Sequence, residues 1–427
     1  NLTPGKQVRV HSSNECPMKR AVFYTCISAL LLVLQAGCYH VRPSSGGGQT
    51  SFTPPREVEA GDVAVPNGYR IEVVATGLTF PTGVAFDSRN VPHVVEAGYS
   101  YGEVWTKPRL LRVQPGTPPT EIASGSDNAP WTGVAFADGF FYIAEGGERH
   151  GGRILRIGSD GETTVLVSDL PTMGDHHTNG PAIGPDGSVY FATGTATNSG
   201  VVGPDNAQFG WLKRKPDFHD VPCRDVTLAG HNFESDDPDG KRERIETGAF
   251  SPFGRSSTPG QIVQGRVPCS GAVMEVAATG GRPELVAWGF RNPFGMAFAP
   301  NGELYVSENG YDDRGSRPVW GTADVLWKVT PGSWYGWPDY SAGRSLEEED
   351  FRAPGKRPLR FLLAQHPGNP PQPATMLGVH SSSNGFDFSR SAQFGYEAQA
   401  FVAQFGDQAP TVGKVLATVG LKIVRSD

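Results

Sequence analysis

The chain has 427 residues, of which 38% are hydrophobic and 19% charged, an ordinary balance for a soluble globular protein with a large core. Its net charge of -7 is spread along the sequence, and no block of Lys and Arg could neutralise a run of phosphates, which argues against nucleic acid as a partner. The 55 glycines and 36 prolines favour many short strands joined by tight turns. We therefore expect an all-β fold.

The start of the chain is not expected to belong to the fold. Residues 1–17 precede a methionine and look like translated upstream sequence. Residues 18–38 then carry two basic residues, an apolar run and small residues, which is the pattern of a bacterial export signal. The apolar run is shorter than the ~20 residues that a bilayer-spanning helix needs. We therefore predict that the rest of the chain is exported.

Cys38 allows two interpretations of the export signal, lipidation of its thiol or simple cleavage. It follows Ala36 and Gly37 directly, as in a lipoprotein processing site, where the thiol is lipidated after cleavage. Gln35, however, stands where that pattern usually has an aliphatic residue. The sequence leaves lipidation and simple cleavage open, so the predicted location is either the periplasm or a lipid anchor on the bacterial envelope.

Residues 39–67 are rich in Ser, Gly and Pro and are expected to form a disordered linker before a folded domain at 68–427. Cys223 and Cys269 are the only cysteines after the signal. Export places them in an oxidising compartment, which favours a disulfide between them. No C-x-x-C spacing or neighbouring histidine completes a metal site, and no haem-attachment motif is present.

One pattern recurs along the folded part: a small residue, an alternating strand, a tight turn, and a second alternating strand with an aromatic residue. The turns often carry Asp-Gly or Asn-Gly, which are hairpin signals. Gly83, Gly133 and Ala182 mark a period of about 50 residues, which is typical of β-propeller blades. The copies, the last of them weaker, begin at Pro81, Trp131, Asn179, Asn292 and Asn384.

The interval between Ala182 and the equivalent Gly295 is more than twice the period. Either an unrecognised blade lies between them, or one blade carries a long insertion. Residues 199–268 are rich in Gly, Pro and Asp and supply such an insertion. A disulfide between the two cysteines would cross-link it.

Polar residues gather where the inner strands of two copies begin. Arg291 precedes the fourth copy, and Asp175, His176 and His177 precede the third, so all should reach the same end of the central channel. A histidine can take a proton near neutral pH, and an arginine can hold negative charge that develops on a bound oxygen. The structural alternative for Arg291 is a salt bridge to a neighbouring blade.

Three segments carry a family resemblance: DHHTNGPAIGPDGSVYFATG, GFRNPFGMAFAPNGELYVSENGYDDRG and TADVLWKVTPGSWYGWPDY. Together they resemble the glucose/sorbosone dehydrogenase family, soluble six-bladed propeller enzymes that use pyrroloquinoline quinone (PQQ). The likeness runs from about Gly68 to the end, and the VPCRD and VPCSG insertion is closer to the sorbosone dehydrogenase-like branch. It implies a six-bladed β-propeller whose last blade is missing or incomplete in this chain.

The resemblance also implies roles for residues. His176 matches the base that takes the proton from the sugar C1 hydroxyl as hydride passes to the quinone. Arg291 matches the arginine that contacts the quinone oxygens, a role that suits a permanently charged fork. Asn309, Gly310 and Tyr311 match the segment that supports the cofactor and its calcium, with the carbonyls of Gly310 and Tyr311 as ligands.

Other matches are weaker. Asp324 resembles an acidic residue that orients the histidine. Trp334, Tyr335 and Trp337 could form a wall for the cofactor or the sugar ring, with core packing as the alternative. Thr195 stands where glucose-oxidising members carry an aspartate, which puts a second carboxylate beside His176 in doubt.

Two further groups remain without a firm role. Lys422 and Arg425 are the nearest candidates for the basic residues that the family places in its last blades. Asp236, Asp237 and Asp239 could bind a second calcium, but they fail the EF-hand spacing and are more often a solvated loop.

The sequence therefore predicts a PQQ- and calcium-dependent dehydrogenase that oxidises an aldose or a related sugar aldehyde. Its electrons would pass to an external acceptor such as a cytochrome. Two alternatives stay open: a calcium-dependent propeller hydrolase of the lactonase kind, and a non-catalytic propeller that binds a ligand. Substrate choice depends on loops that the sequence does not resolve.

Overall fold

The structure, a computed structural model, describes residues 60–98, 106–147, 149–208, 210–238, 240–406 and 422–426. The predicted upstream segment, the export signal with Cys38 and the greater part of the predicted linker lie outside these residues. Within them, no helix is both long and apolar enough to cross a membrane.

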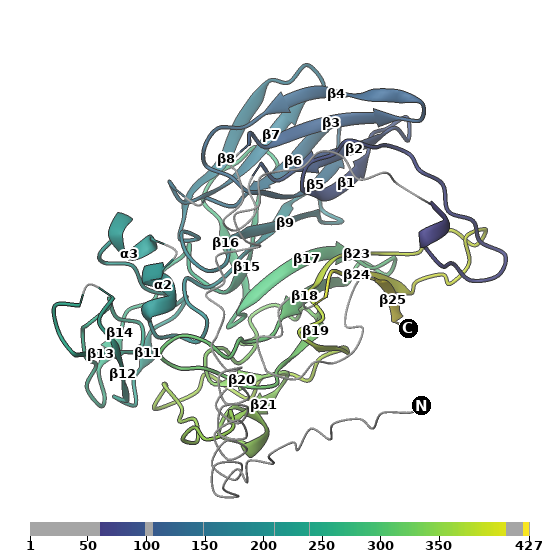
Figure 1. Cartoon of the computed structure of the whole chain (residues 1–427). Helices are drawn as coiled ribbons and strands as arrows, with labels where there is room; N and C mark the ends of the chain where they lie inside the picture. Colours follow the sequence, from purple (N-terminus) through teal and green to yellow (C-terminus); the bar gives the residue numbers. More distant parts are fainter. Residues whose placement is uncertain are drawn as a thin grey trace, which may run out of the picture. The chain divides into compact units, whose positions relative to one another are not determined.

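The described chain is almost entirely β structure and contains five blade-like sheets (Figure 1). Four of these sheets have four antiparallel strands, and the last has three. The first sheet holds β1 (Pro81–Phe86), β2 (Pro92–Glu96), β3 (Arg109–Gln114) and β4 (Thr117–Ser124). The second holds β5 (Trp131–Ala137), β6 (Phe140–Glu145), β7 (Gly152–Gly158) and β8 (Thr163–Leu170).

The third and fourth sheets carry the candidate site. The third holds β9 (Thr178–Ile183), β10 (Val189–Thr193), β15 (Ala272–Val276) and β16 (Glu284–Trp288). The fourth holds β17 (Asn292–Phe298), β18 (Leu304–Asn309), β19 (Ala323–Lys328) and β22 (Thr375–Val379). The three-stranded sheet holds β23 (Ser383–Phe388), β24 (Ala400–Gln404) and β25 (Lys422–Ser426). The predicted all-β propeller arrangement is confirmed for five blades, and the sixth blade stays a prediction.

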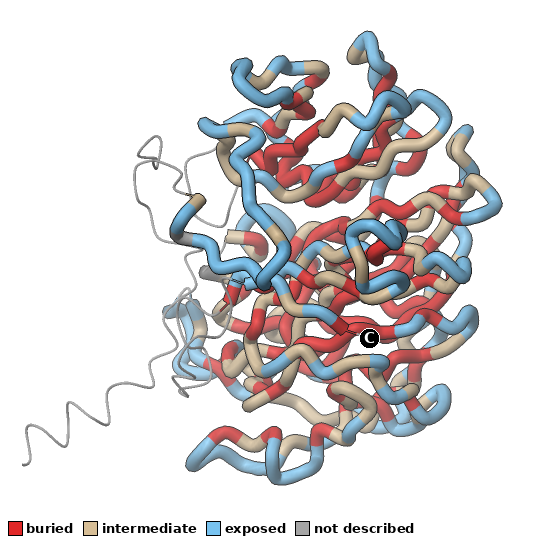
Figure 2. The backbone as a smooth tube through the Cα atoms, turned by 90° about the vertical axis from the view of Figure 1, so that its right-hand side faces the viewer, coloured by how far each residue is buried: buried red, intermediate tan, exposed pale blue. Residues whose placement is uncertain are grey.

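Successive blades meet along their first strands, because β1, β5, β9, β17 and β23 contact one another in that order. Side chains tie each of these inner strands to the next one. Thr82 Oγ1 donates to the Trp131 carbonyl at 2.7 Å, and Thr132 Oγ1 donates to the Thr178 carbonyl at 2.6 Å. The inner strands line a hollow of about 2000 Å³. Figure 2 shows buried residues gathered in the interior of the fold and exposed residues mostly along its outer edges.

The glycine of the repeat allows this close approach of neighbouring blades. A Cβ atom at Gly133 would overlap the carbonyl oxygen of Gly180 in the next blade, and one at Gly295 would overlap that of Asn384. Because backbone cannot move aside as a flexible side chain can, any larger residue would push two blades apart. At Gly133 and Gly295 the glycine is therefore a packing requirement between blades.

We expect Gly133→Ala to destabilise the propeller by about 1–3 kcal/mol or more, because the added methyl group overpacks a backbone contact. Gly385→Ala is the matched control, since an added Cβ in β23 would meet nothing within 4 Å. The free energy of unfolding from denaturant titration checks the difference. Equal stability of the two variants would contradict the packing argument.

A glutamate at or next to the end of the second strand fixes the loop that leads into the inner strand of the first, second and fourth blades. Glu96 accepts a hydrogen bond from the Thr79 backbone, Glu145 accepts one from Asn128 Nδ2, and Glu308 accepts one from the Arg291 backbone. Glu308 also accepts a bond from Trp327 Nε1 at 2.5 Å. Burial raises the pKa of Glu308 to about 7, although the donors from Arg291 and Trp327 oppose that shift.

The long interval is an insertion inside the third blade, because β10 pairs directly with β15. It holds two short helices and two small sheets: α2 (Pro204–Gln208), α3 (Trp211–Arg214), β11 (Val226–Thr227) with β14 (Ile262–Val263), and β12 (Asn232–Asp236) with β13 (Arg244–Gly248). A disulfide joins Cys223 to Cys269, as the sequence predicted.

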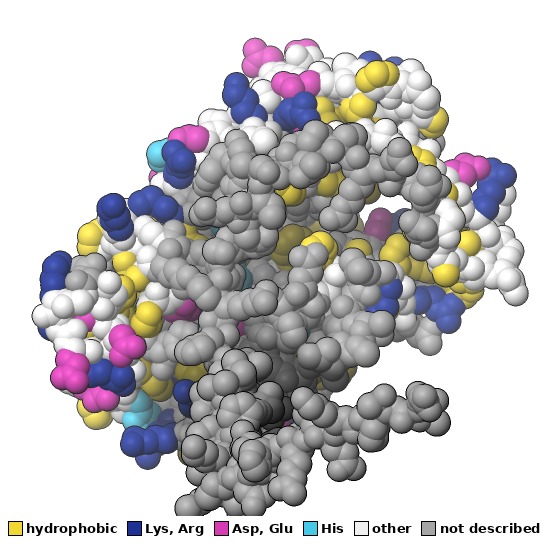
Figure 3. Space-filling model, in the orientation of Figure 1, with side chains coloured by type: hydrophobic (Ala, Val, Ile, Leu, Met, Phe, Trp, Pro, Cys, Tyr) yellow, Lys and Arg dark blue, Asp and Glu magenta, His cyan; other side chains and the backbone are white. Residues whose placement is uncertain are grey.

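Acidic and basic side chains alternate over this insertion in the space-filling view (Figure 3). Asp236 pairs with Arg244 at 3.0 Å, and Asp237 lies 3.7 Å from Arg242. Their carboxylates are therefore engaged by arginines, which favours the solvated-loop reading over a second calcium site. Asp239 lies outside the described residues.

Candidate functional site

The histidine loop extends the β9–β10 hairpin beyond its last ladder pair. The backbone N–H of Asp175 donates to the Ala196 carbonyl, that of His176 to the Thr195 carbonyl, and that of Gly194 to the His177 carbonyl. Gly194 permits the close pairing, because a Cβ there would overlap the Cβ of His176. Backbone hydrogen bonds thus fasten the loop to the residues that follow β10, although the loop itself precedes the first residue of β9.

Thr195 joins the histidine to the arginine of the next blade. Its backbone N–H donates to the Arg291 carbonyl at 2.9 Å, while its own carbonyl accepts from the backbone of His176 at 3.1 Å. His176 and Arg291 therefore stand on either side of Thr195, at the same end of adjacent blades. Both side chains are buried, with 5% and 4% of their surface exposed.

The hydrogen bonds of His176 select one ring nitrogen as the base. Its Nδ1 lies 2.9 Å from the Thr195 carbonyl oxygen, which can only accept a proton, so Nδ1 carries the hydrogen. Nε2 then keeps its lone pair, and it faces Asp175 Oδ2 at 3.6 Å, beyond hydrogen-bond length. Burial, reinforced by the charge of Arg291, lowers the pKa of His176 to about 3 and keeps the ring neutral.

All five N–H donors of Arg291 are bonded to protein acceptors. Nε donates to the Asn198 carbonyl at 3.1 Å, and Nη2 donates to Asn198 Oδ1 at 2.8 Å and to Asp312 Oδ2 at 2.8 Å. Nη1 donates to the carbonyls of Gly310 at 2.5 Å and Asn309 at 3.4 Å. A ligand oxygen can bind this guanidinium only by replacing one of these acceptors.

A second buried arginine links this cluster to the histidine loop. Arg314 pairs with Asp312 and, at 2.8 Å, with Asp205, and it also makes a short pair with Asp175, next to His176. Burial raises the pKa of Asp175 and of Asp312, but the arginines outweigh it and hold both pKa values below the ordinary range. The pKa of Asp205 is raised, because its burial outweighs the effect of Arg314.

Asp324 is not brought to His176. One oxygen of its carboxylate accepts from the Gly310 backbone at 2.9 Å, and the other accepts from the Ser383 backbone at 2.8 Å and from Ser381 Oγ at 3.0 Å. The predicted orienting role thus falls to the Thr195 carbonyl, since Nδ1 of His176 is bonded there. Asp324 instead fastens the segment after β18 to the start of β23.

The two carbonyls predicted to bind calcium already accept protein hydrogen bonds. The Gly310 carbonyl accepts from Arg291, and the Tyr311 carbonyl accepts from Thr322 Oγ1 at 2.8 Å. Each carbonyl oxygen has a second lone pair, so the donor chemistry fits a hard cation. No cluster of three His, Cys, Asp or Glu side chains among the described residues is placed to hold a metal. A cation here would depend on carbonyls and on ligand oxygens.

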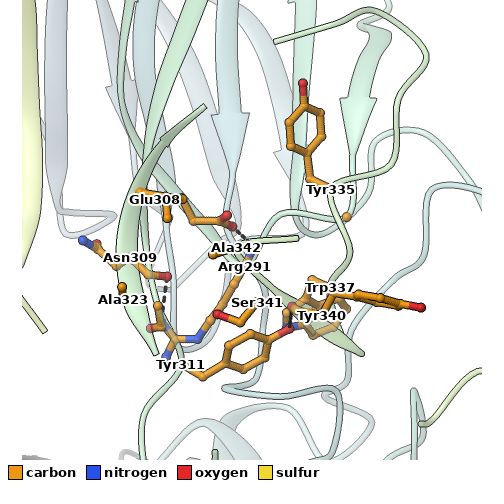
Figure 4. Close-up of a pocket in the computed structure, with 13 residues that line it drawn as sticks. Arg291, Glu308, Asn309, Tyr311, Ala323, Tyr335, Trp337, Tyr340, Ser341 and Ala342 are labelled. Carbon is orange, nitrogen blue, oxygen red and sulfur yellow. Dashed lines mark hydrogen bonds between the residues drawn. The ribbon is translucent and has the colours of Figure 1, made fainter. Parts of the chain in front are cut away.

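The aromatic segment packs chiefly into the core. The Tyr335 ring stacks on Phe290 with 4.2 Å between centroids, and its hydroxyl donates to the Lys328 carbonyl. Trp334 stacks on His366 at 5.4 Å. Figure 4 shows the Tyr335 ring directed away from Arg291, while Tyr311 lies near it. For Trp334 and Tyr335 the packing alternative is therefore the one the structure favours.

Trp337 lies closer to the arginine cluster. Its Nε1 donates weakly to the Asn198 carbonyl at 3.5 Å, and it lines a small cavity with Arg291, Tyr311 and Tyr340 (Figure 4). That cavity measures about 10 Å³, room for one water molecule. A ligand the size of a sugar or a quinone would have to approach Arg291 from another side.

The structure also adds site residues that the sequence did not single out: Asn198, Asp205, Asp312, Arg314 and His380, whose Nδ1 lies 3.6 Å from Asp312 Oδ1. The charged YDDRG stretch after β18 was a usable signal for two of them. Asn198 lies in a Gly/Ser/Thr-rich stretch with no distinguishing pattern. Lys422 and Arg425 lie on β25, where Arg425 stands 4.1 Å over the Tyr396 ring.

The family model described as Glucose / Sorbosone dehydrogenase matches residues 260–366. That segment contains Arg291, the β18–β19 residues and the aromatic segment. No curated protein matches the chain.

Several solved structures are similar to the chain at low identity. The PQQ-bound aldose sugar dehydrogenase of Streptomyces coelicolor is 17% identical, with 78% of this chain and 77% of that chain covered and a TM-score of 0.44. The soluble aldose sugar dehydrogenase of Escherichia coli in its apo-form is 15% identical, with coverage of 78% and 82% and a TM-score of 0.47. The family AA12 enzyme of Trichoderma reesei is 17% identical, with coverage of 85% and 81% and a TM-score of 0.48.

Proposed function

We propose that the chain is a PQQ-dependent sugar dehydrogenase that oxidises an aldose or a related sugar aldehyde. The observation that carries the proposal is His176, a buried neutral base whose Nε2 is left free of a donor bond, placed across Thr195 from the permanent cation Arg291. The family match over residues 260–366 supports it, because that segment contains Arg291 and the Asn309–Tyr311 turn.

His176 would take the proton from the sugar hydroxyl at Nε2 while its Nδ1–H stays on the Thr195 carbonyl. The charge of the resulting imidazolium would be stabilised by Asp175, whose Oδ2 lies 3.6 Å from Nε2. PQQ, when bound, supplies the acceptor for the hydride that leaves the sugar carbon bearing that hydroxyl. Arg291 would bind oxygen atoms of that group in exchange for one of its present acceptors.

Other parts of the proposal rest on the sequence alone. Calcium would be held by the carbonyls of Gly310 and Tyr311 together with cofactor oxygens. The chain would be exported, with Cys38 either lipidated or removed with the signal. Electrons would leave to an external acceptor such as a cytochrome, and the closed ring would have six blades.

The test is a spectral titration of the full chain with PQQ in the presence of calcium, followed by addition of glucose, sorbosone and other aldoses. We expect saturable binding of PQQ and a change to the reduced spectrum with at least one sugar. Binding without reduction by any aldose or sugar aldehyde would refute the substrate class. If PQQ does not bind, the dehydrogenase assignment is wrong, and lactone hydrolysis would then separate the hydrolase alternative from a binding module.

A further inference from the structure

We infer that Asn198 is a positioning residue for Arg291: it holds one edge of the guanidinium, so that a ligand can reach only the end now occupied by Asp312. The catalytic consequence of this inference rests on the function proposed above, whereas the geometry does not. Asn198 lies after β10, at the start of the insertion, with 2% of its surface exposed.

Asn198 occupies the Nε–Nη2 edge of the arginine with two of its own atoms. Its backbone carbonyl accepts from Nε at 3.1 Å, and its Oδ1 accepts from Nη2 at 2.8 Å. This is the bidentate pairing that a carboxylate or phosphate usually makes with arginine. A neutral residue therefore fills the edge that an anion would otherwise use, without cancelling the positive charge.

The same side chain fixes the turn on the other side of Arg291. Its Nδ2 donates to the carbonyls of Asp312 at 2.8 Å and Arg314 at 3.2 Å, while Oδ1 also accepts from the Asp312 backbone N–H at 2.9 Å. Every hydrogen-bonding group of the buried side-chain amide thus has a partner, and a buried polar group without a partner is destabilising. Asn198 therefore connects the arginine to the loop that supplies its counterion.

Of the acceptors on Arg291, the Asp312 side chain is the one best suited to give way. Asp312 Oδ2 also accepts from Arg314 at 2.9 Å, and Oδ1 lies 3.6 Å from His380. These neighbours would keep the carboxylate paired after it releases Arg291. The carbonyls of Asn198 and Gly310 are fixed in the backbone, and the only other donor to either among the described residues is Trp337 Nε1, which lies 3.5 Å from the Asn198 carbonyl.

The first experiment uses the protein without cofactor. The Nη2–H resonances of Arg291, assigned by their loss in Arg291→Lys, should exchange with solvent at least tenfold faster in Asn198→Ala than in the parent, because the variant removes Oδ1 as an acceptor of Nη2. Asn198→Asp keeps an oxygen as the acceptor of Arg291 Nη2, so the exchange rate of Arg291 should stay within a few-fold of the parent. Its second oxygen would face the carbonyls of Asp312 and Arg314, where Asn198 Nδ2 now donates. The Nη2–H resonances of Arg153, whose Nη2 pairs with Glu145 at 2.5 Å in the second blade, are the internal reference.

The second experiment measures PQQ affinity by spectral titration. We expect at least tenfold weaker binding for Asn198→Ala, and no change for Asn232→Ala, which removes another asparagine of the insertion whose side chain is hydrogen-bonded to a neighbouring residue, Ser257. Unchanged Arg291 exchange in Asn198→Ala would overturn the inference even if the enzyme is active. Changed exchange with no PQQ binding by the parent would retain the positioning role and reject the proposed cofactor.

Discussion

His176→Ala is expected to lower kcat/KM for sugar oxidation by about 10²–10⁴-fold, the usual contribution of a positioned general base. The reason is geometric, since the Thr195 carbonyl holds Nδ1–H and leaves Nε2 as the proton acceptor. Steady-state kinetics with an artificial electron acceptor would measure the loss. His93→Ala is the control, because His93 is also buried but lies in the first blade, where Nδ1 is bonded to Val91.

The pH profile gives this prediction a second readout. With a pKa of about 3, His176 remains a base well below the ordinary histidine value, so its protonation should not reduce kcat/KM between pH 8 and 5. The stability of the fold, unlike kcat/KM, should depend on the protonation of His176 in this pH range. A lowered histidine pKa means that the unfolded chain binds the proton first, so this contribution is complete above pH ~6.5 and is lost as pH falls towards about 3. A kcat/KM that falls with an apparent pKa near 6.5 while the fold is intact would contradict the assignment.

Arg314→Leu should reduce the free energy of unfolding by about 3–5 kcal/mol at neutral pH, because it leaves buried carboxylates without their cation. Arg314 pairs with Asp175, Asp205 and Asp312, and only 8% of its surface is exposed. Arg344→Leu is the matched control: its pairs with Glu348 and Asp350 are at the surface, where such pairs contribute about 0–1 kcal/mol. Denaturant titration of both variants measures the two losses.

The loss in Arg314→Leu should shrink as pH falls. The parent holds the pKa values of Asp175 and Asp312 below the ordinary range, so the stability that they contribute is present above pH ~4 and is lost below it. In the variant these carboxylates can take up protons and so relieve the unpaired charge. A difference between the two proteins that stays constant from pH 7 to pH 4 would show that lost packing, and not charge, is responsible.

Much of the fold could be read from local sequence. The alternation of apolar residues and the Asp-Gly and Asn-Gly turns are properties of neighbouring residues, and they located the hairpins that the structure contains at β1–β2, β5–β6, β9–β10 and β17–β18. The same regularity placed His176 and Arg291 at equivalent positions before adjacent inner strands, which is why both lie beside Thr195. The cysteine pair followed from composition and predicted export.

What the local sequence did not contain was the choice of partners. Asp324 resembles an orienting acid, yet its carboxylate is bound to Gly310 and Ser383, and Thr195 holds the histidine. The sequence allowed Tyr335 to face a ligand, but its ring packs in the core against Phe290.

The arrangement around the arginine depends on contacts between residues far apart in the chain. Asn198 meets Arg314, 116 residues away, and Arg314 meets Asp175, 139 residues away. The repeating pattern determined by itself that blades form and that their polar ends converge. Only the closing of one blade against the next decided which buried charges pair and which donors are satisfied, because burial makes each unpaired group costly and the available partners are brought together by the tertiary structure.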